Sequence, residues 1–434
     1  MKAFAQVWLV VLLAGVGVAA ASELPQPVTD ADYRPVDMAE VRLGHLLFYD
    51  PILSGNRNIS CAACHHPRLG TSDGLSLGLG EGGIGLGPER VVDLGNPPEQ
   101  RIPRNAPALW NLGASEFTVL FHDGRIEVDP ERPGGLRTPL DEDMVQGFSG
   151  LLSAQTMFPV LSQDEMAGHY SENEISKAVR LGRITGAGGA WDLISERVAG
   201  IEAYREMFAA AYPERDEIAF TDISNAIAAF MAFEWRSDDS AFDAHLRGQG
   251  ALTGDALAGM ALFYGEAGCA ACHAGPFQTD HGFYAMGEPQ LGPGKAARFE
   301  SHAQDLGRMR VTGRAEDAYR FRVPSLRNVA LTAPYGHAGA YRDLKRFVAA
   351  HYGGADWNKA QAVLPDLDVE DWRAFEDPAE RDAIAAAYEG PEFALGERQV
   401  AQLVAFLDSL TGQGALTGRL GVPDAVPSGL RVDR

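Results

Sequence analysis

Two pentapeptides decide most of what this sequence says, Cys61-Ala62-Ala63-Cys64-His65 and Cys269-Ala270-Ala271-Cys272-His273, and together they contain all four cysteines. Cys-x-x-Cys-His is the attachment motif of c-type haem: two thiols add to the haem vinyl groups, and the histidine becomes the proximal iron ligand. A thioredoxin-like redox pair or half a zinc site does not explain a histidine after both pairs. Two structural disulfides in an oxidising compartment are the remaining alternative. The motifs predict two covalent haems.

The sequence around the motifs is repeated. Gly44–Tyr49 precedes the first motif and Gly259–Tyr264 the second, and both read as the end of an amphipathic helix. In the second helix, the apolar positions at helical spacing are Leu257, Ala261 and Tyr264. Each half also ends with an apolar helical stripe, formed by Ile223, Ile227, Phe230 and Met231 in one and by Val400, Leu403, Val404 and Leu407 in the other.

This repeat predicts a mainly α fold with two cytochrome c-like haem domains in tandem and long loops. The expected parts are a domain over residues 23–240, a domain over residues 241–412 joined through a linker near Ser237–Gly254, and an irregular tail over residues 413–434. The first half carries long Gly/Pro-rich loops, and long loops in a compact protein usually carry function. We therefore expect the first half to build the substrate pocket.

The N-terminus has the pattern of a secretory signal peptide. Met1 and Lys2 precede an apolar run from Val7 to Val18, and small residues, Ala19-Ala20-Ala21-Ser22, follow it. A membrane anchor needs a longer apolar span. Residues 1–22 are therefore expected to be removed on export, most simply to the periplasm, where haem is joined to this motif.

The length and composition of the chain favour a globular enzyme over a small single-haem cytochrome, and its charge limits the partners. The chain has 434 residues, 46% of them hydrophobic, which is enough for two or more cores. Its formal net charge of -22 argues against nucleic acid and anionic membrane surfaces. The charge would suit a partner with a basic face, such as a lysine-rich small cytochrome, although solubility alone explains it equally well.

Several motifs in order resemble those of the bacterial di-haem cytochrome c peroxidase and MauG family, from about residue 40 to residue 412. Besides the two haem motifs, they are Leu43-Gly44, Phe48-Tyr49-Asp50, Leu53-Ser54, Arg104-Asn105-Ala106-Pro107, Asp123-Gly124-Arg125, Gln155, Pro159, Glu165-Met166, Gly275, Asp305, Gly307-Arg308, the run Val323–Tyr335, and His337. The resemblance implies a first haem that reacts with hydrogen peroxide and a second haem that transfers electrons.

The resemblance also assigns catalytic residues beside the first haem. Glu165 matches the distal glutamate of the family and Gln155 its distal glutamine. A carboxylate there can move a proton from the inner to the outer peroxide oxygen, so that water leaves rather than hydroxide. Without the resemblance, Glu165 would pass as an ordinary surface acid. An insertion after Arg125 makes the match of Gln155 the weaker of the two.

For the second haem, the family places a methionine or a tyrosine on the far side of the iron. Counting from Thr332 leads to His351, followed by Tyr352, and His351 is the preferred ligand; Met286 and Met309 are outside candidates. A bis-histidine iron has a lower potential than a methionine-capped one. Tyr352 as the ligand would instead follow the MauG arrangement. A polar residue that simply ends a helix is the plainer interpretation of His351.

Two positions depart from the family pattern. Glu81 stands where reductively activated peroxidases have a histidine that caps the resting iron, so the first haem is expected to be open without activation, as in MauG. His122 stands where the family usually has a tryptophan between the haems, and a histidine there is expected to weaken electron sharing between them.

The resemblance further implies one calcium ion, held by the Asn105 side chain and by the carbonyls of Thr332 and Pro334. Three functions follow as candidates: peroxide reduction with electrons from a small redox protein, MauG-like oxidation of a protein substrate, and a non-enzymatic di-haem electron carrier. Glu165 and the long first half speak against the carrier. Family peroxidases are often dimers, so a homodimer is a further possibility that the sequence leaves open.

Overall fold

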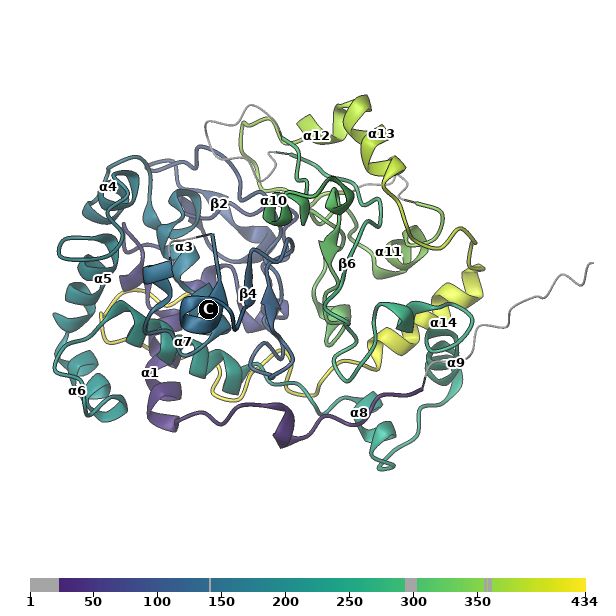
Figure 1. The fold of residues 1–434 in the computed structure, drawn as a ribbon, viewed down its shortest axis with the longest axis horizontal. Coiled ribbons are helices and arrows are strands. Elements are labelled where there is room, and N and C mark those ends of the chain that lie inside the picture. Colours follow the sequence, from purple (N-terminus) through teal and green to yellow (C-terminus); the bar gives the residue numbers. More distant parts are fainter. Residues whose placement is uncertain (1–22, 140–141, 293–302, 355–356, 358–360) are drawn as a thin grey trace, which may run out of the picture.

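The fold was determined as a computed structural model that describes residues 23–139, 142–292, 303–354, 357 and 361–434. It is mainly helical, and Figure 1 shows two lobes, one built around α1 and α7 and the other around α9 and α14. The helices are α1 (Met38–Tyr49), α2 (Leu151–Gln155), α3 (Met157–Leu161), α4 (Glu174–Arg180), α5 (Ala190–Ala199), α6 (Glu202–Ala211), α7 (Phe220–Glu234), α8 (Ala241–Leu246), α9 (Gly254–Phe263), α10 (Met309–Thr312), α11 (Leu344–Ala350), α12 (Arg373–Glu376), α13 (Pro378–Ala386) and α14 (Glu397–Asp408).

Short antiparallel strands stiffen the loops between these helices. They are β1 (Gly83–Ile84), β2 (Val91–Val92), β3 (Val119–Leu120), β4 (Ile126–Val128), β5 (Leu136–Arg137), β6 (Phe283–Tyr284) and β7 (Phe321–Arg322). They pair as β1-β2, β3-β4-β5 and β6-β7. The two halves of the chain meet beside these sheets, where the backbone N–H of Arg322 donates to the carbonyl of His122 over 2.8 Å.

The same helix crossing occurs once in each lobe. Helix α1 packs across α7, and a Cβ on Gly44 would collide with the carbonyl of Ala226 in α7. Helix α9 packs across α14, and a Cβ on Gly259 would collide with the carbonyl of Gln402 in α14. Because a side chain at either glycine would push the helices apart, the repeated glycine sets the close approach of both pairs. The expected tandem arrangement of two similar helical units is present.

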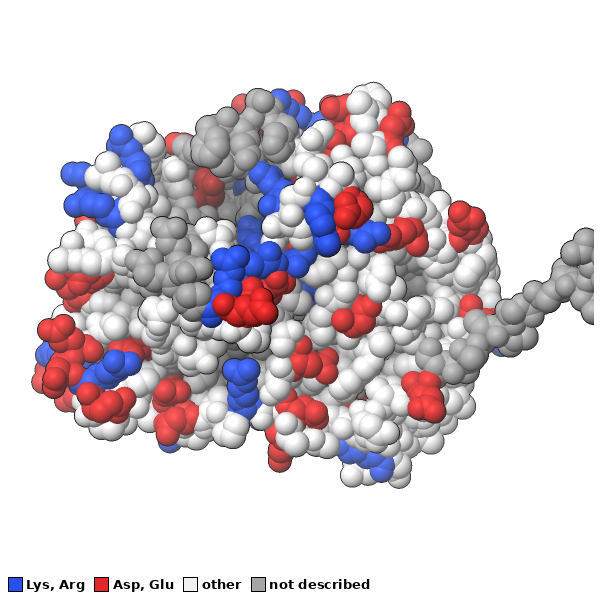
Figure 2. All heavy atoms as spheres, viewed as in Figure 1, with Lys and Arg blue, Asp and Glu red and all other residues white. Residues whose placement is uncertain are grey.

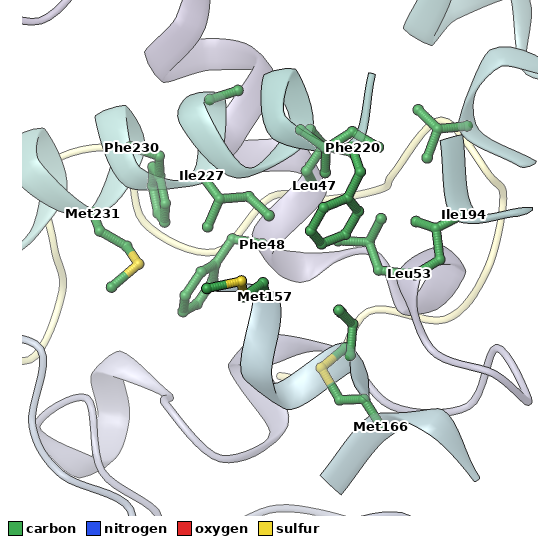
Figure 3. Close-up of a cluster of buried hydrophobic side chains, with 14 of the residues drawn as sticks. Leu47, Phe48, Leu53, Met157, Met166, Ile194, Phe220, Ile227, Phe230 and Met231 are labelled. Carbon is green, nitrogen blue, oxygen red and sulfur yellow. The ribbon is translucent and has the colours of Figure 1, made fainter. Parts of the chain in front are cut away.

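The core of the first lobe fills the space under the α1–α7 crossing. Figure 3 shows Leu47 and Phe48 of α1 facing Ile227 and Phe230 of α7, with Met157 of α3 beside them. Phe48 and Phe230 have ring centroids 5.2 Å apart. This apolar packing holds α1 against α7.

The region expected to be the linker, Ser237–Gly254, contains helix α8, which Ser240 caps by accepting a hydrogen bond from the Asp243 N–H. The apolar stripe expected for α9 is correct only in part. Tyr264, just after the helix, is buried, but Leu257 and Ala261 are exposed, and Gly259 and Phe263 are buried in their place. Contact with α14 through a glycine selects that face, and an apolar periodicity rule gives glycine no weight.

The C-terminal tail after α14 has no helix or strand, yet it runs back along the first lobe. His45 Nε2 of α1 lies 2.7 Å from the Gly421 carbonyl oxygen, and Ser428 Oγ donates to the buried carboxylate of Asp50 over 2.6 Å. Val426 is buried in the core of the first lobe. The last residues of the chain therefore complete the fold of the first lobe.

No helix within the described part of the chain is long and apolar enough to cross a membrane. The expected signal peptide, residues 1–22, lies outside the described residues.

Candidate haem sites

The first haem motif forms a tight turn. Cys61–Ala63 is one turn of 3-10 helix, and the His65 Nδ1–H donates to the Thr71 carbonyl over 3.0 Å. This bond leaves Nε2 of His65 unprotonated and available to a metal, which is how proteins usually orient a histidine ligand. Burial lowers the pKa of His65, so the imidazole is neutral. The turn therefore offers two thiols and one oriented imidazole, as haem c requires.

The cysteines themselves argue against thiol redox chemistry. All four are free thiols, and burial raises the pKa of Cys61 and of Cys64 to about 12. Thiol–disulfide exchange needs a thiolate, which a pKa this high suppresses at neutral pH.

The second motif repeats the geometry of the first. Cys269–Ala271 is again one turn of 3-10 helix, and the His273 Nδ1–H donates to the Gln278 carbonyl over 3.1 Å. Burial, and after it the nearby charge of His351, lowers the pKa of His273 to about 4. The charge of His351 therefore acts on His273, although 78 positions separate the two residues in the sequence.

His351 and Tyr352 follow α11 and have different surroundings. The His351 Nδ1–H donates to the Phe347 carbonyl over 2.9 Å, so its Nε2 is left available in the same way as in His65 and His273. The Tyr352 hydroxyl donates to the Ala267 carbonyl over 2.8 Å and lies 3.5 Å from Cys269 Sγ. Of the two, His351 has the free ligand atom. Met286 follows β6 and Met309 begins α10.

Glu165 lies in a single turn of π-helix, Gln163–Ala167, after α3. Its charge contributes to the raised pKa of Cys64, which locates the carboxylate near the first motif. The Glu165 side chain is half-buried. Gln155, also half-buried, ends α2, and Thr156 separates it from α3. The charge of Glu165 acts on Cys64 of the first motif, and the roles of Glu165 and Gln155 remain predictions from the sequence.

Glu81 is completely buried and held by amide groups. Its Oε1 accepts from the side chains of Asn56, Asn58 and Asn96 over 2.9, 2.6 and 2.9 Å. His169 Nε2 lies 3.4 Å from Oε2. A carboxylate with these partners is fixed in place rather than free to swing toward an iron.

The Glu81 loop also supports the turn that carries Glu165. The backbone N–H of Glu81 donates to the Asp164 carbonyl over 2.9 Å, and a side chain at Gly80 would collide with that carbonyl. Buried Arg90 donates to the carbonyls of Ala63, over 3.2 Å, and Gly80, over 2.6 Å. Arg90 thus connects the haem motif to the loop beside Glu165. Sequence patterns alone did not reveal this residue, because a single arginine in a Gly-rich loop carries no signal.

A buried charged cluster joins the two halves. His122 Nε2 lies 2.9 Å and His337 Nε2 3.5 Å from Asp305 Oδ2, and Arg104 Nη1 is 3.5 Å from the same oxygen. Burial, followed by the charge of Arg104, lowers the pKa of both histidines. Burial by itself would raise the pKa of Asp305, but these three neighbours outweigh it and hold that pKa well below its usual range. The junction therefore contains an ionised Asp305, an Arg104 cation and two neutral imidazoles.

The residues expected to hold calcium come together from both halves. The Asn105 side-chain amide lies 3.2 Å from the Pro334 carbonyl oxygen, and Thr332 belongs to the same loop as Pro334. The described residues contain no group of three or more His, Cys, Asp or Glu that could hold a metal. A site made here would consist of amide and carbonyl oxygens with water, a donor set that fits calcium.

Comparison with known proteins decides the family. A family model for the di-haem cytochrome c peroxidases matches residues 38–251. Cytochrome c551 peroxidase of Nitrosomonas europaea is 31% identical over 338 residues, covering 78% of this chain and 79% of that protein. This chain belongs to the di-haem cytochrome c peroxidase and MauG family. Membership of this di-haem family implies two c-type haems, which matches the number of Cys-x-x-Cys-His motifs.

Other relatives of this di-haem peroxidase include proteins named MauG or MauG-like. Methylamine utilization protein MauG of Methylorubrum extorquens is 28% identical over 394 residues, covering 90% of this chain and 83% of that protein. The crystal structure of a MauG-like protein associated with microbial copper homeostasis aligns with a TM-score of 0.61 and 26% identity, covering 92% and 96% of the two chains. The diheme peroxidase BthA of Burkholderia thailandensis, at 23% identity and a TM-score of 0.57, shares the fold.

Proposed function

We propose that this protein is an exported, periplasmic peroxidase that reduces hydrogen peroxide to water with electrons from a small redox protein. The observation that carries the proposal is the asymmetry between its two haem sites. His351 neighbours His273 with a free Nε2, whereas the first motif has a half-buried carboxylate, Glu165, as its neighbour. One site is suited to electron transfer through a doubly ligated iron, and the other is suited to proton-coupled chemistry.

The haem groups would supply the electron-accepting and electron-donating chemistry at both sites. His65 would hold the first iron, and His273 and His351 would hold the second. Glu165 would take the proton from the inner peroxide oxygen and return it to the outer one, so that water departs. Arg90 and the Glu81 loop would hold the Glu165 turn at a fixed distance from the first motif.

Calcium would bind where the two halves meet. The side-chain oxygen of Asn105 and the carbonyls of Thr332 and Pro334 would coordinate it, so that the ion stabilises the contact between residues 23–240 and 241–412 rather than taking part in the reaction. The signal-like residues 1–22 support the periplasm as the compartment, since that is where haem is joined to this motif.

A MauG-like oxidation of a protein substrate is the second candidate. The fixed position of Glu81 favours it, because a first haem that Glu81 does not cap would meet peroxide without prior reduction. His122 disfavours it, because a neutral imidazole in place of an indole conducts oxidising equivalents less well. The two functions share the first step and differ in where the electrons come from.

Rapid-mixing absorbance of the fully oxidised holoprotein with hydrogen peroxide tests the proposal. A fast change in the haem spectrum, lost in Glu165→Gln, followed by turnover with a reduced small cytochrome, supports the peroxidase. A spectral change without cytochrome turnover, together with a peroxide-dependent mass change in a co-expressed exported protein, supports the MauG-like function. No reaction with peroxide in any redox state excludes both.

A further inference from the structure

A tryptophan is hydrogen-bonded to the loop that orients the first proximal histidine. The Trp110 indole N–H donates to the Gly70 carbonyl over 3.0 Å, and the carbonyl of the next residue, Thr71, accepts from His65 Nδ1 over 3.0 Å. The Leu109 N–H adds a third bond, to Thr71 Oγ1, over 2.8 Å. Two hydrogen bonds and one peptide unit therefore connect the indole of Trp110 to the imidazole of His65, which is a short path for an electron.

The same tryptophan lines a cavity at the surface. The cavity has a volume of about 80 Å³, and Trp110, Glu234, Asp238, Asp239, Arg236 and Arg419 contribute to its walls. The Trp110 side chain is itself only 4% exposed. Trp235 meets the Trp110 ring edge-on, with centroids 5.7 Å apart. One indole thus lies between the first haem motif and a small site that solvent molecules can enter.

The surroundings suit loss of one electron from this indole. Its N–H is bonded to a peptide carbonyl, which does not take up a proton, so the oxidised ring keeps its positive charge. Three carboxylates against two guanidinium groups in the cavity wall give an excess of negative charge, and this favours a cation there. The T-shaped contact with Trp235 adds a second electron-rich ring beside it.

We propose that Trp110 relays electrons from a small reducing molecule in this cavity to the oxidised first haem, as a second route of electron entry that bypasses the second haem. In each cycle hydrogen peroxide takes up two electrons and two protons and becomes two molecules of water. Two donor molecules each lose one electron through Trp110, and the protons come from solvent. This inference rests on the peroxidase function proposed above.

The cavity defines the class of donor. Its volume is about half of the ~150 Å³ in which a buried site accommodates benzene, so a single ring can enter only partly, from the open side. The negative excess of the wall selects neutral or cationic molecules over anions. A one-ring aromatic amine has this chemistry, whereas ferrocyanide, which is anionic, does not.

The test uses the di-haem holoprotein, hydrogen peroxide, and p-phenylenediamine or ferrocyanide as donor. In Trp110→Phe we expect kcat/KM for p-phenylenediamine to fall by about tenfold or more. A tryptophan radical signal, seen by electron paramagnetic resonance after peroxide is added without donor, should disappear in the same variant. Turnover with a reduced small cytochrome should fall far less than turnover with p-phenylenediamine, because those electrons arrive through the second haem, whereas loss of the Trp110–Gly70 hydrogen bond affects both donors equally. Trp191→Phe is the matched control: Trp191 stacks on Phe220 at 4.9 Å and does not line the cavity.

A second variant separates occupancy of the cavity from the redox role of the indole. Gly414 lines the cavity, and nothing lies within 4 Å of a Cβ added there. Gly414→Trp should therefore raise the KM for p-phenylenediamine about fivefold or more while the radical signal remains. Unchanged p-phenylenediamine kinetics in Trp110→Phe, an equal loss in Trp191→Phe, or equal use of ferrocyanide would overturn the relay. If cytochrome turnover proceeds in that case, the peroxidase function still stands; if the wild type does not react with peroxide, both fail.

Discussion

The hydroxyl of Tyr352 lies 3.5 Å from the sulfur of Cys269, and its neighbour His351 is the residue whose charge reaches His273. These adjacent side chains therefore have different contacts: Tyr352 contacts Cys269, whereas His351 bonds the Phe347 carbonyl through Nδ1, which leaves Nε2 for the proposed iron. The Tyr352 hydroxyl donates a hydrogen bond to the Ala267 carbonyl, which makes Tyr352 a weaker candidate than His351 for a ligand of the second iron.

The first prediction concerns the potential of the second haem. His351→Met should raise its reduction potential by on the order of 100 mV, because a thioether stabilises reduced iron better than an imidazole does. Tyr352→Phe should shift it far less. Spectroelectrochemical titration of both variants measures the change. A large shift in Tyr352→Phe with none in His351→Met would reverse the assignment.

A second prediction concerns proton transfer at the first haem. Glu165→Gln should slow the reaction of the oxidised holoprotein with peroxide by about 10²- to 10⁴-fold, the usual loss when a general acid–base group is removed. Stopped-flow absorbance measures this rate. Glu174→Gln is the control, since Glu174 is an exposed acid of α4 paired with Arg197. Equal rates in wild type and Glu165→Gln would remove Glu165 from the mechanism.

The amide cluster around Glu81 gives a third prediction. Glu81→Ala should lower the free energy of unfolding by about 1–3 kcal/mol, because the side chains of Asn56, Asn58 and Asn96 would lose the buried carboxylate that accepts from all three. The loop should also loosen against Asp164, so the reaction with peroxide should slow as well. Urea unfolding and stopped-flow absorbance report the two effects. A stable variant with wild-type kinetics would mean that the loop is held by other contacts.

The junction between the halves should respond to pH. The pKa of buried His122 is lowered, so the unfolded chain takes up this proton first as the pH falls, and the free energy of unfolding decreases below about pH 6.5. The neighbouring Asp305 has a pKa well below its usual range, so its contribution is present above about pH 4 and is lost only in stronger acid. Arg104, His337 and Asp123 are the other charged or titratable groups that act on His122 or Asp305.

His122→Phe should therefore flatten the pH dependence by up to about 1.4 kcal/mol per pH unit between pH 6.5 and the folded pKa. Urea unfolding of the holoprotein at about pH 7.5, 6.5 and 5.5 measures the slope. His245→Gln, in α8, serves as the control. The interpretation fails if the two variants have the same slope.

The repeated glycines provide a fifth prediction. Gly44→Ala and Gly259→Ala should each destabilise their own lobe by about 2 kcal/mol or more, because the added methyl group meets a backbone carbonyl that cannot move alone. Gly414→Ala, with nothing within 4 Å of the added Cβ, should be close to neutral. Thermal unfolding compares the three. Wild-type stability in both crossing variants would show that the helices can separate at little cost.

The features that occur in both halves of the chain could be predicted from the sequence, whereas contacts that occur only once could not. Both haem motifs, the paired helices and the tandem arrangement follow from patterns within the chain, because helical spacing and the Cys-x-x-Cys-His motif are local. The buried face of α9 was predicted only in part: Tyr264 is buried, but Leu257 and Ala261 are exposed, because a glycine contact rather than apolar character selects that face.

The residues that hold the candidate site in place could not be predicted, because they follow no sequence pattern. Arg90, Trp110 and the asparagines around Glu81 act through contacts between segments far apart in the chain, and only the fold reveals them. Glu165 could be named from a family match, but the effect of its charge on Cys64 required the structure.

The tail that returns to α1 has a consequence for the order of folding. Ser428 bonds Asp50 across 378 positions of sequence, and Val426 packs into the core of the first lobe. A contact between residues so far apart closes a very long loop, which costs conformational entropy, so it is expected to form late. The lobe that comes first in the sequence is therefore expected to be the last to complete its packing.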